Sequence, residues 1–239
     1  MKLLYTIGLF FLLYSSAWGI GFPSSYYQID DSAKQKEAFI GYLKELVDKG
    51  NKEIEEEREF VTRFFEQAMT DAFRGLGQKN IGKLIALRNK YSIEDLFDRE
   101  AYYKKIDTVP LSLAIAQAAL ESGWGKSRFA REANNIFGHW TYSGVGLMPQ
   151  NRAEGKSHMI RIFGSLQKSV NGYLLNLNTN SAYEDFRQVR YDVRKAGKTF
   201  DGKMAAATMI NYSELKKEYI KMLLEMMEQN ELFAYDIKN

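Results

Sequence analysis

The 239-residue sequence contains no cysteine, only two histidines and only three prolines. Without cysteine there is no disulfide, no thiolate metal site and no cysteine nucleophile, so stability must come from packing. Two histidines, His139 and His158, also disfavour a histidine-rich zinc site. The HExxH, GxSxG and phosphate-binding glycine-loop motifs are absent too. We therefore expect no metal and no cofactor.

The composition, 45% hydrophobic and 26% charged, is that of an ordinary globular protein. The charge is unevenly distributed. Residues 30–74 carry twelve acidic and eight basic side chains, whereas residues 75–239 carry 18 acidic and 24 basic ones. The basic part favours contact with acidic polymers or anionic surfaces. Since no nucleic-acid-binding motif accompanies it, we do not expect nucleic acid as a partner.

The first 19 residues predict a secretory signal. Lys2 precedes an apolar stretch from Leu3 to Tyr14, and the small residues Ala17 and Gly19 follow at a plausible cleavage point. The apolar stretch is short for a helix that crosses a bilayer, although retention as an uncleaved anchor is the alternative. We expect an exported protein of the periplasm or cell envelope, without a stable membrane span once the signal is cleaved.

The region that follows is predicted to be helical. Apolar residues at helical spacing indicate one helix from Ser32 to Gly50–Asn51 and a second that ends at Gly75, packed as an antiparallel pair. Two shorter helices are expected over 81–90 and 92–105, the latter capped by its first residue. The acidic charge of the pair is typical of a solvated helix face. One further hypothesis is that the pair covers and restrains the basic remainder of the chain.

An almost uncharged helix is predicted from Pro110 onward, in the stretch VPLSLAIAQAALESGWG. A helix that is apolar on every side is buried. Its first formal charge is Glu121, and two glycines that end helices follow within four residues. Burial and the negative helix end both raise a carboxyl pKa, as a general acid requires. The alternative is a buried glutamate satisfied by Ser122, Ser127 or a backbone donor.

The motifs AQAALESGWGKS and NNIFG, in this order, resemble the signature of bacterial peptidoglycan-cleaving N-acetylglucosaminidases. This family includes flagellar-rod hydrolases, mannosyl-glycoprotein endo-beta-N-acetylglucosaminidase-like proteins and a Bax-like branch, which the chain resembles most. The resemblance covers about residues 107–232 and implies that Glu121 is the catalytic acid. It implies a mainly α, lysozyme-like α domain with a small β-hairpin lobe, preceded by a helical extension. We assign 1–19 to the signal, 20–105 to the extension and 106–239 to the catalytic domain.

A second carboxyl group is expected, because glycosidases usually use two. Glu154 is the candidate, in the glycine-punctuated and β-prone stretch 139–163, after which helical spacing returns. Its neighbours Arg152 and Lys156 make a surface ion pair the alternative. A route in which the 2-acetamido group of the sugar replaces the second carboxylate has also been discussed for the family.

Sugar sites combine flat apolar faces with hydrogen-bonding groups, so aromatic side chains are the candidates for substrate binding. We select Phe137, Trp140, Tyr183 and Tyr212. Tyr183 and Tyr212 fall where the family has recurrent tyrosines, but the family's YATD-like element is YSEL here and lacks the aspartate. Trp124 and Tyr219 are assigned to the core.

The resemblance implies a peptidoglycan hydrolase that cuts β-1,4 bonds after N-acetylglucosamine and remodels the cell wall. Its partners are then peptidoglycan glycan strands, and protein partners are unknown. One alternative is a muramidase or lytic transglycosylase that cuts the neighbouring bond with a similar glutamate. The other is a non-catalytic wall-binding or scaffold protein that keeps the fold without turnover.

Overall fold

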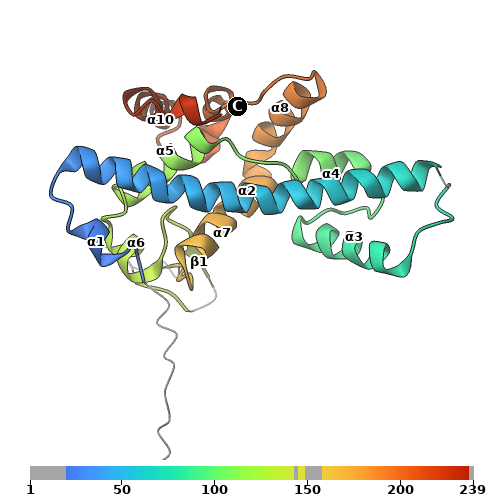
Figure 1. The fold of residues 1–239 in the computed structure, drawn as a ribbon, viewed down its shortest axis with the longest axis horizontal. Helices are drawn as coiled ribbons and strands as arrows, with labels where there is room; N and C mark the ends of the chain where they lie inside the picture. The colour runs from blue at the N-terminus through green and yellow to red at the C-terminus, as the bar shows by residue number, and fades with distance from the viewer. Residues whose placement is uncertain (1–19, 71, 143–144, 149–157, 237–239) are drawn as a thin grey trace, which may run out of the picture.

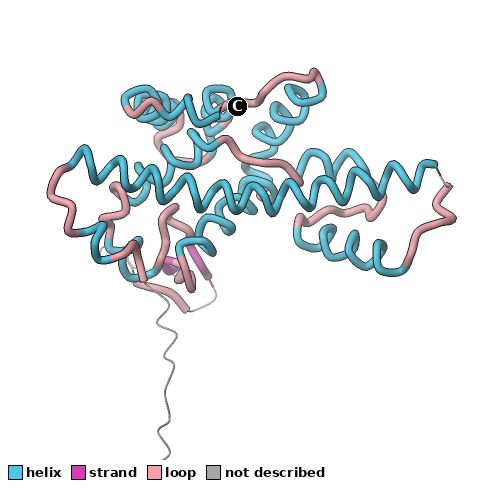
Figure 2. Tube along the Cα trace, viewed as in Figure 1, coloured by secondary structure: helices cyan, strands magenta, loops and turns pink. Residues whose placement is uncertain are grey.

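The computed structural model describes residues 20–70, 72–142, 145–148 and 158–236, and this part of the chain is mainly α-helical (Figure 2). The α-helices are α1 (Ser24–Tyr27), α2 (Ser32–Thr70), α3 (Gln78–Lys90), α4 (Arg99–Lys105), α5 (Leu111–Ser122), α6 (Arg128–Ala133), α7 (Leu166–Thr179), α8 (Glu184–Lys195), α9 (Gly202–Ala207) and α10 (Lys217–Gln229). The 3-10 helices are η1 (Ser181–Tyr183), η2 (Met209–Asn211) and η3 (Leu232–Asp236). Strands β1 (Trp140–Thr141) and β2 (Met159–Ile160) pair antiparallel. The predicted mainly α fold with a small β-hairpin is confirmed.

Helix α2 is continuous over 39 residues and runs along the longest axis of the molecule (Figure 1). The predicted break at Gly50–Asn51 is therefore wrong. Gly50 lies where α7 crosses, and a Cβ atom there would come within 2.5 Å of Leu174 Cδ1. The Asn51 amide donates to the Val109 carbonyl at 2.8 Å and accepts from the Val109 N–H at 3.0 Å. Gly50 and Asn51 therefore do not form a turn, and instead contact segments that are distant in the sequence.

One hydrophobic core contains residues from both predicted regions. Phe39, Leu43 and Val47 of α2 are fully buried in the same cluster as Leu113 of α5 and Leu177 of α7. Figure 1 shows α5 and α7 passing behind α2. The boundary between 20–105 and 106–239 stays a prediction, because sharing a core does not define where a domain begins. In the part of the chain that the structure describes, no helix has the length and hydrophobicity needed to cross a membrane.

Two predicted helix starts are wrong. Helix α4 begins at Arg99, not at residue 92, and Asp98 caps it by accepting from the Ala101 N–H at 3.0 Å. Ser92 instead adopts a positive φ of 50°, which a helical residue does not have. The apolar spacing predicts a last long helix over Ser213–Gln229, but α10 begins at Lys217. In both places a cap-like residue lies in a turn that precedes the helix.

A buried charge cluster fixes the segment that leads into α5. Asp107 is 2% exposed, and its Oδ2 lies 2.9 Å from Arg194 Nε, 3.6 Å from Arg58 and 3.9 Å from Arg190. Arg190 is itself fully buried and donates to the backbone carbonyls of Asp107 and Thr108 at 3.0 Å. Burial lowers the pKa of Arg190 to about 10, so it keeps its charge at neutral pH. These contacts set the position from which α5 starts.

Candidate active site

Helix α5 is anchored at both ends and presents Glu121 in its last turn. At its N-terminus the Asp236 carboxylate accepts from the Ser112 N–H at 3.0 Å and from its hydroxyl at 2.6 Å, a favourable place for an anion. The helix body is buried almost throughout. At the C-terminus Gly123 adopts the left-handed conformation, with φ of 55°, and ends the helix. The prediction of a buried helix that ends just after Glu121 is confirmed.

The Glu121 carboxylate is held by a directed chain of hydrogen bonds. Tyr219 donates its hydroxyl to Glu121 Oε1 at 2.9 Å. The Tyr219 oxygen accepts from the Gln117 amide at 3.3 Å, and the Gln117 carbonyl accepts from Tyr173 at 2.6 Å. The alternative serine partners are engaged elsewhere: the Ser122 hydroxyl donates to the Ala118 carbonyl, and the Ser127 hydroxyl accepts from the Ala130 N–H. This chain of hydrogen bonds ends on Oε1 and leaves the second carboxylate oxygen of Glu121, Oε2, open to other groups.

The predicted rise in the pKa of Glu121 is confirmed in direction. The residue is exposed at the surface, so a substrate can reach it, while protein atoms crowd the inner side of its carboxyl group. This desolvation raises the pKa, and the hydrogen bond from Tyr219 lowers it by a smaller amount. A carboxyl group with a raised pKa keeps its proton closer to neutral pH and can act as a general acid.

The NNIFG motif brings a glycine against Glu121. Asn135 donates to the carbonyls of His139 and Arg161, both at 2.8 Å, and accepts from the His139 N–H at 2.9 Å. These bonds fix the segment in which Gly138 has a φ of 67°. A Cβ atom on Gly138 would lie 3.6 Å from Glu121 Oε2. The glycine therefore keeps the space beside this oxygen free of a side chain.

Three tyrosines gather around Glu121. Tyr212 stacks on Tyr219 with ring centroids 5.4 Å apart and planes at 9°, and Tyr183 packs on Tyr212 at 5.9 Å. Burial raises the pKa values of Tyr183 and Tyr212, and the charge of Glu121 adds a smaller rise to both. The structure thus brings two predicted site residues to the catalytic candidate. It also adds Tyr219, assigned to the core by its helical spacing; a buried tyrosine hydroxyl that needs a partner was the available signal.

The remaining candidates lie in different surroundings. Phe137 is 3% exposed and stacks on Tyr173 at 3.9 Å, so this face of its ring is covered. Trp140 is 50% exposed on β1. Glu154 falls outside the described residues. Trp124 packs against the core, in agreement with its predicted role.

Within the described ranges no cluster of three or more acidic or histidine side chains is placed to hold a metal.

The segment that follows residue 19 packs against the loop after Glu121. The Gly21 N–H donates to the Asn134 side chain at 2.8 Å, and the Tyr26 hydroxyl donates to the Trp124 carbonyl. Pro23 and the serine and tyrosine pairs that follow it predict a loop over residues 20–30, but the structure places the one-turn helix α1 there. The beginning of the described chain thereby supports both sequence motifs of the site.

Comparison with known proteins assigns the chain to a family. A model of the glucosaminidase family, described as mannosyl-glycoprotein endo-beta-N-acetylglucosaminidase, matches residues 98–232, more than half of the sequence. The chain belongs to the glucosaminidase family. The family consists of glycoside hydrolases of the endo-β-N-acetylglucosaminidase type, so the class of enzyme expected from the two motifs is confirmed.

Individual proteins and solved structures match part of the chain. Protein bax of Escherichia coli (strain K12) is 36% identical over 132 residues, which cover 54% of this chain and 45% of that protein. The chain thus matches less than half the length of this relative. Among solved structures, the catalytic domain of the autolysin Auto from Listeria monocytogenes is 23% identical with a TM-score of 0.41, covering 71% of this chain and 96% of that one. A C-terminally truncated glycoside hydrolase domain of FlgJ from Salmonella typhimurium is 22% identical with a TM-score of 0.38, covering 61% and 97%.

Replacing Tyr219 by Phe is expected to move the pH dependence of this glucosaminidase domain. The Tyr219 hydrogen bond stabilises the charged form of Glu121 and lowers its pKa. Its loss raises that pKa, so the alkaline limb of the kcat/KM profile moves to higher pH, and kcat falls because Glu121 is less well oriented. The measurement is the pH–rate profile of the wild type and of Tyr219→Phe. Tyr235→Phe, on η3, is the matched control, and an unmoved alkaline limb in Tyr219→Phe would contradict the assignment.

His139 is expected to make the fold less stable in acid. Its ring lies between Phe137 and Phe163, its Nε2 atom is buried without a hydrogen-bond partner, and burial lowers its pKa to about 4. The unfolded histidine binds its proton near pH 6.5. Between about pH 6.5 and 4 only the unfolded state is protonated, so the free energy of unfolding falls by up to about 3 kcal/mol as the pH drops.

Urea unfolding at pH 7 and pH 4.5 measures this effect. Other groups also titrate in this window, so the informative quantity is the difference between wild type and His139→Phe. The variant is expected to lose less stability on acidification than the wild type does. His158→Phe is the matched control, and equal losses in wild type and His139→Phe would contradict the prediction.

Proposed function

We propose that this protein is a peptidoglycan hydrolase that cleaves the β-1,4 bond after N-acetylglucosamine, with Glu121 as the general acid. The observation that carries the proposal is the position of Glu121 in the ESGWG motif. It ends a buried helix, accepts a hydrogen bond from Tyr219 and has a raised pKa. A purely wall-binding protein would gain nothing from a desolvated acid at this place.

The proton is transferred from Glu121 Oε2 to the leaving glycosidic oxygen. Tyr219 donates its hydroxyl to Oε1, so the proton of the neutral acid is carried by the other oxygen, which faces Gly138. Protonation converts a poor leaving group into a neutral hydroxyl as the sugar ring acquires positive charge. Tyr183 and Tyr212, which pack with Tyr219 near Glu121, are our candidates for contacts to the sugar.

The second catalytic group is proposed to be Glu154 or the 2-acetamido group of the substrate. Among the described residues no second carboxyl group contributes to the pKa of Glu121, which depends on burial and on Tyr219. The activity of the Glu154→Gln variant distinguishes the two routes. Loss of activity in this variant supports a protein carboxylate, whereas persistent activity together with an inactive Glu121→Gln supports the acetamido group.

We further propose that the mature protein acts in the cell envelope after removal of residues 1–19, where it remodels the wall. The excess of basic over acidic side chains in residues 75–239 suits an anionic polymer. The division into a helical extension, 20–105, and a catalytic domain, 106–239, belongs to this proposal, as does restraint of activity by the extension. Since α2 packs into the shared core, the restraint has to be tested by point changes on its exposed face and not by deletion.

Product analysis tests the proposed bond. Purified peptidoglycan is digested with the mature protein, the soluble fragments are reduced with borohydride, and their reducing ends are identified by mass spectrometry. Reduced N-acetylglucosamine ends support the proposal. Reduced N-acetylmuramic acid ends indicate a muramidase, and 1,6-anhydro ends indicate a lytic transglycosylase. Wall binding without any released fragment moves the binding-protein alternative to first place.

A further inference from the structure

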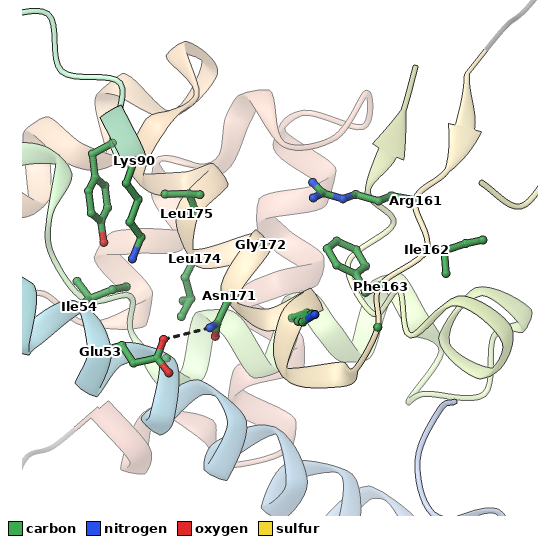
Figure 3. Close-up of a pocket in the computed structure, with 14 residues that line it drawn as sticks. Glu53, Ile54, Lys90, Arg161, Ile162, Phe163, Asn171, Gly172, Leu174 and Leu175 are labelled. Carbon is green, nitrogen blue, oxygen red and sulfur yellow. Dashed lines mark hydrogen bonds between the residues drawn. The ribbon is translucent and has the colours of Figure 1, made fainter. Parts of the chain in front are cut away.

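A second concave site lies away from Glu121. A cavity of about 490 Å³ is enclosed by α2, the end of α3, the segment after β2 and α7 (Figure 3). Neither Glu121 nor any of the three tyrosines around it lines this cavity. Cavities of a few hundred Å³ with an apolar floor and a few convergent polar groups are the usual form of small-ligand sites.

The floor of the cavity is apolar and its two ends carry opposite functional groups. The floor is made by Ile54, Phe163, Leu174 and Leu175. At one end Arg161 stacks its guanidinium on Phe163, 4.9 Å from the ring centroid, and Lys168 reaches toward Gly164. Figure 3 shows Glu53 and Lys90 on the other side of the cavity from Arg161.

Glu53 presents a carboxylate to this opposite end. It accepts a hydrogen bond from the Asn171 side chain at 3.1 Å, drawn in Figure 3. The neighbouring Lys90 is already paired with Glu57 at 2.7 Å, so its charge is compensated within the protein. A ligand with a carboxylate at one end and an ammonium group at the other would therefore find a complementary charge at both ends.

The β1–β2 hairpin connects the cavity to Glu121 over a short distance. The Arg161 N–H donates to the His139 carbonyl at 2.9 Å, and His139 directly follows Gly138, which lies against Glu121. Gly138 and Arg161 are thus separated by one residue along the chain, about 3.8 Å, and one strand spacing, about 4.8 Å. An extended peptide gains about 3.3–3.6 Å per residue, so three residues span this separation.

We propose that this cavity binds the peptide stem of the glycan that is cleaved at Glu121. Such stems are short peptides that carry free carboxylates and, at a diamino acid, an ammonium group. Arg161 receives a stem carboxylate, Glu53 receives the ammonium group, and the apolar floor covers the aliphatic part. The inference rests on the proposed function for its ligand class and assigns the protein a preference for peptide-bearing strands.

Binding of a free stem tetrapeptide, measured by isothermal titration calorimetry, tests the cavity without requiring turnover. A peptide with a diamino acid at its third position should bind the wild type. Arg161→Ala should weaken binding at least about tenfold, since a charge-assisted hydrogen bond is worth about 1.5–3 kcal/mol. Arg161 is exposed, and its hydrogen bonds with Asn135 and His139 are made by its backbone, so the substitution removes only the guanidinium and its contact with Phe163 and should retain the fold. Lys221→Ala on α10 is the matched control.

A second variant and a second substrate keep the outcomes separate. Glu53→Gln should weaken the binding of the stem tetrapeptide more than it weakens the binding of an analogue in which the ammonium group is acetylated. No measurable binding by the wild type, or equal binding by wild type and Arg161→Ala, overturns the inference. Glycan strands stripped of their peptides test the other proposal. If the wild type cleaves these strands but binds no peptide, only the cavity assignment fails. If it binds the peptide but cleaves neither stripped nor peptide-bearing strands, only the proposed hydrolysis fails.

Discussion

Replacing Glu121 by Gln is expected to lower the rate of peptidoglycan solubilisation by about 100- to 10,000-fold, the usual contribution of a general acid. Glutamine has the size of glutamate and its carbonyl can still accept from Tyr219, so the hydrogen-bond chain to Gln117 and Tyr173 remains. What the variant lacks is the transferable proton beside Gly138. The loss should therefore appear in kcat, with little change in the binding of the polymer.

The control is an exposed glutamate on another helix, without a contact to the candidate active site. Glu225 lies on α10, is exposed and pairs loosely with Lys221 at 3.8 Å. Glu225→Gln should keep the wild-type rate. Circular dichroism and thermal unfolding confirm that each variant is folded. A Glu121→Gln protein that keeps more than a tenth of the wild-type rate would show that another group donates the proton.

Replacing Asp107 by Ala is expected to lower the free energy of unfolding by about 3–5 kcal/mol, the cost of leaving buried charges unpaired. Asp107 is the carboxylate between Arg58, Arg190 and Arg194. Without it, three guanidinium groups face one another, and Arg190 has no access to water. Its Oδ1 atom also accepts from the Thr108 N–H at 2.8 Å, so the turn before α5 loses a hydrogen bond too.

Chemical unfolding in urea measures this loss. Asp48→Ala is the matched control, because its ion pair with Lys44 is about half exposed on both sides. Exposed pairs of this kind contribute about 0–1 kcal/mol. Equal stabilities for Asp107→Ala and Asp48→Ala would mean that the arginines are solvated in the native state, and the role assigned to the cluster would be wrong.

Local patterns predicted the part of the site that α5 carries. Pro110, the unbroken apolar run and the glycines after Glu121 define a buried helix and its end from adjacent residues alone, and the structure has this helix at 111–122. The ESGWG and NNIFG motifs are separated by one short helix, α6, and the structure places Gly138 of the second motif beside the Glu121 carboxylate of the first. The position and the direction of the pKa shift of Glu121 followed from these features.

Contacts between distant segments were not predictable in this way. Gly50–Asn51 has the composition of a helix end, yet both residues are used against α7 and Val109, more than fifty positions away. Tyr219 is 98 positions from Glu121, and its helical spacing is identical to that of a core residue. No local pattern states which buried tyrosine directs its hydroxyl to the acid. The spatial relation had to come from the fold.

A general-acid role requires that Glu121 hold its proton because protein atoms crowd its carboxyl group, and a direct titration of Glu121 tests this. Carbon-13 NMR of the glutamate side chains is followed against pH in the wild type, with Glu121→Gln to assign the resonance. We expect this resonance to titrate above the ordinary glutamate pKa of about 4.3 and to move higher still in Tyr219→Phe. A resonance that titrates at or below about 4.3 would contradict it, because Glu121 would then be ionised wherever the enzyme works.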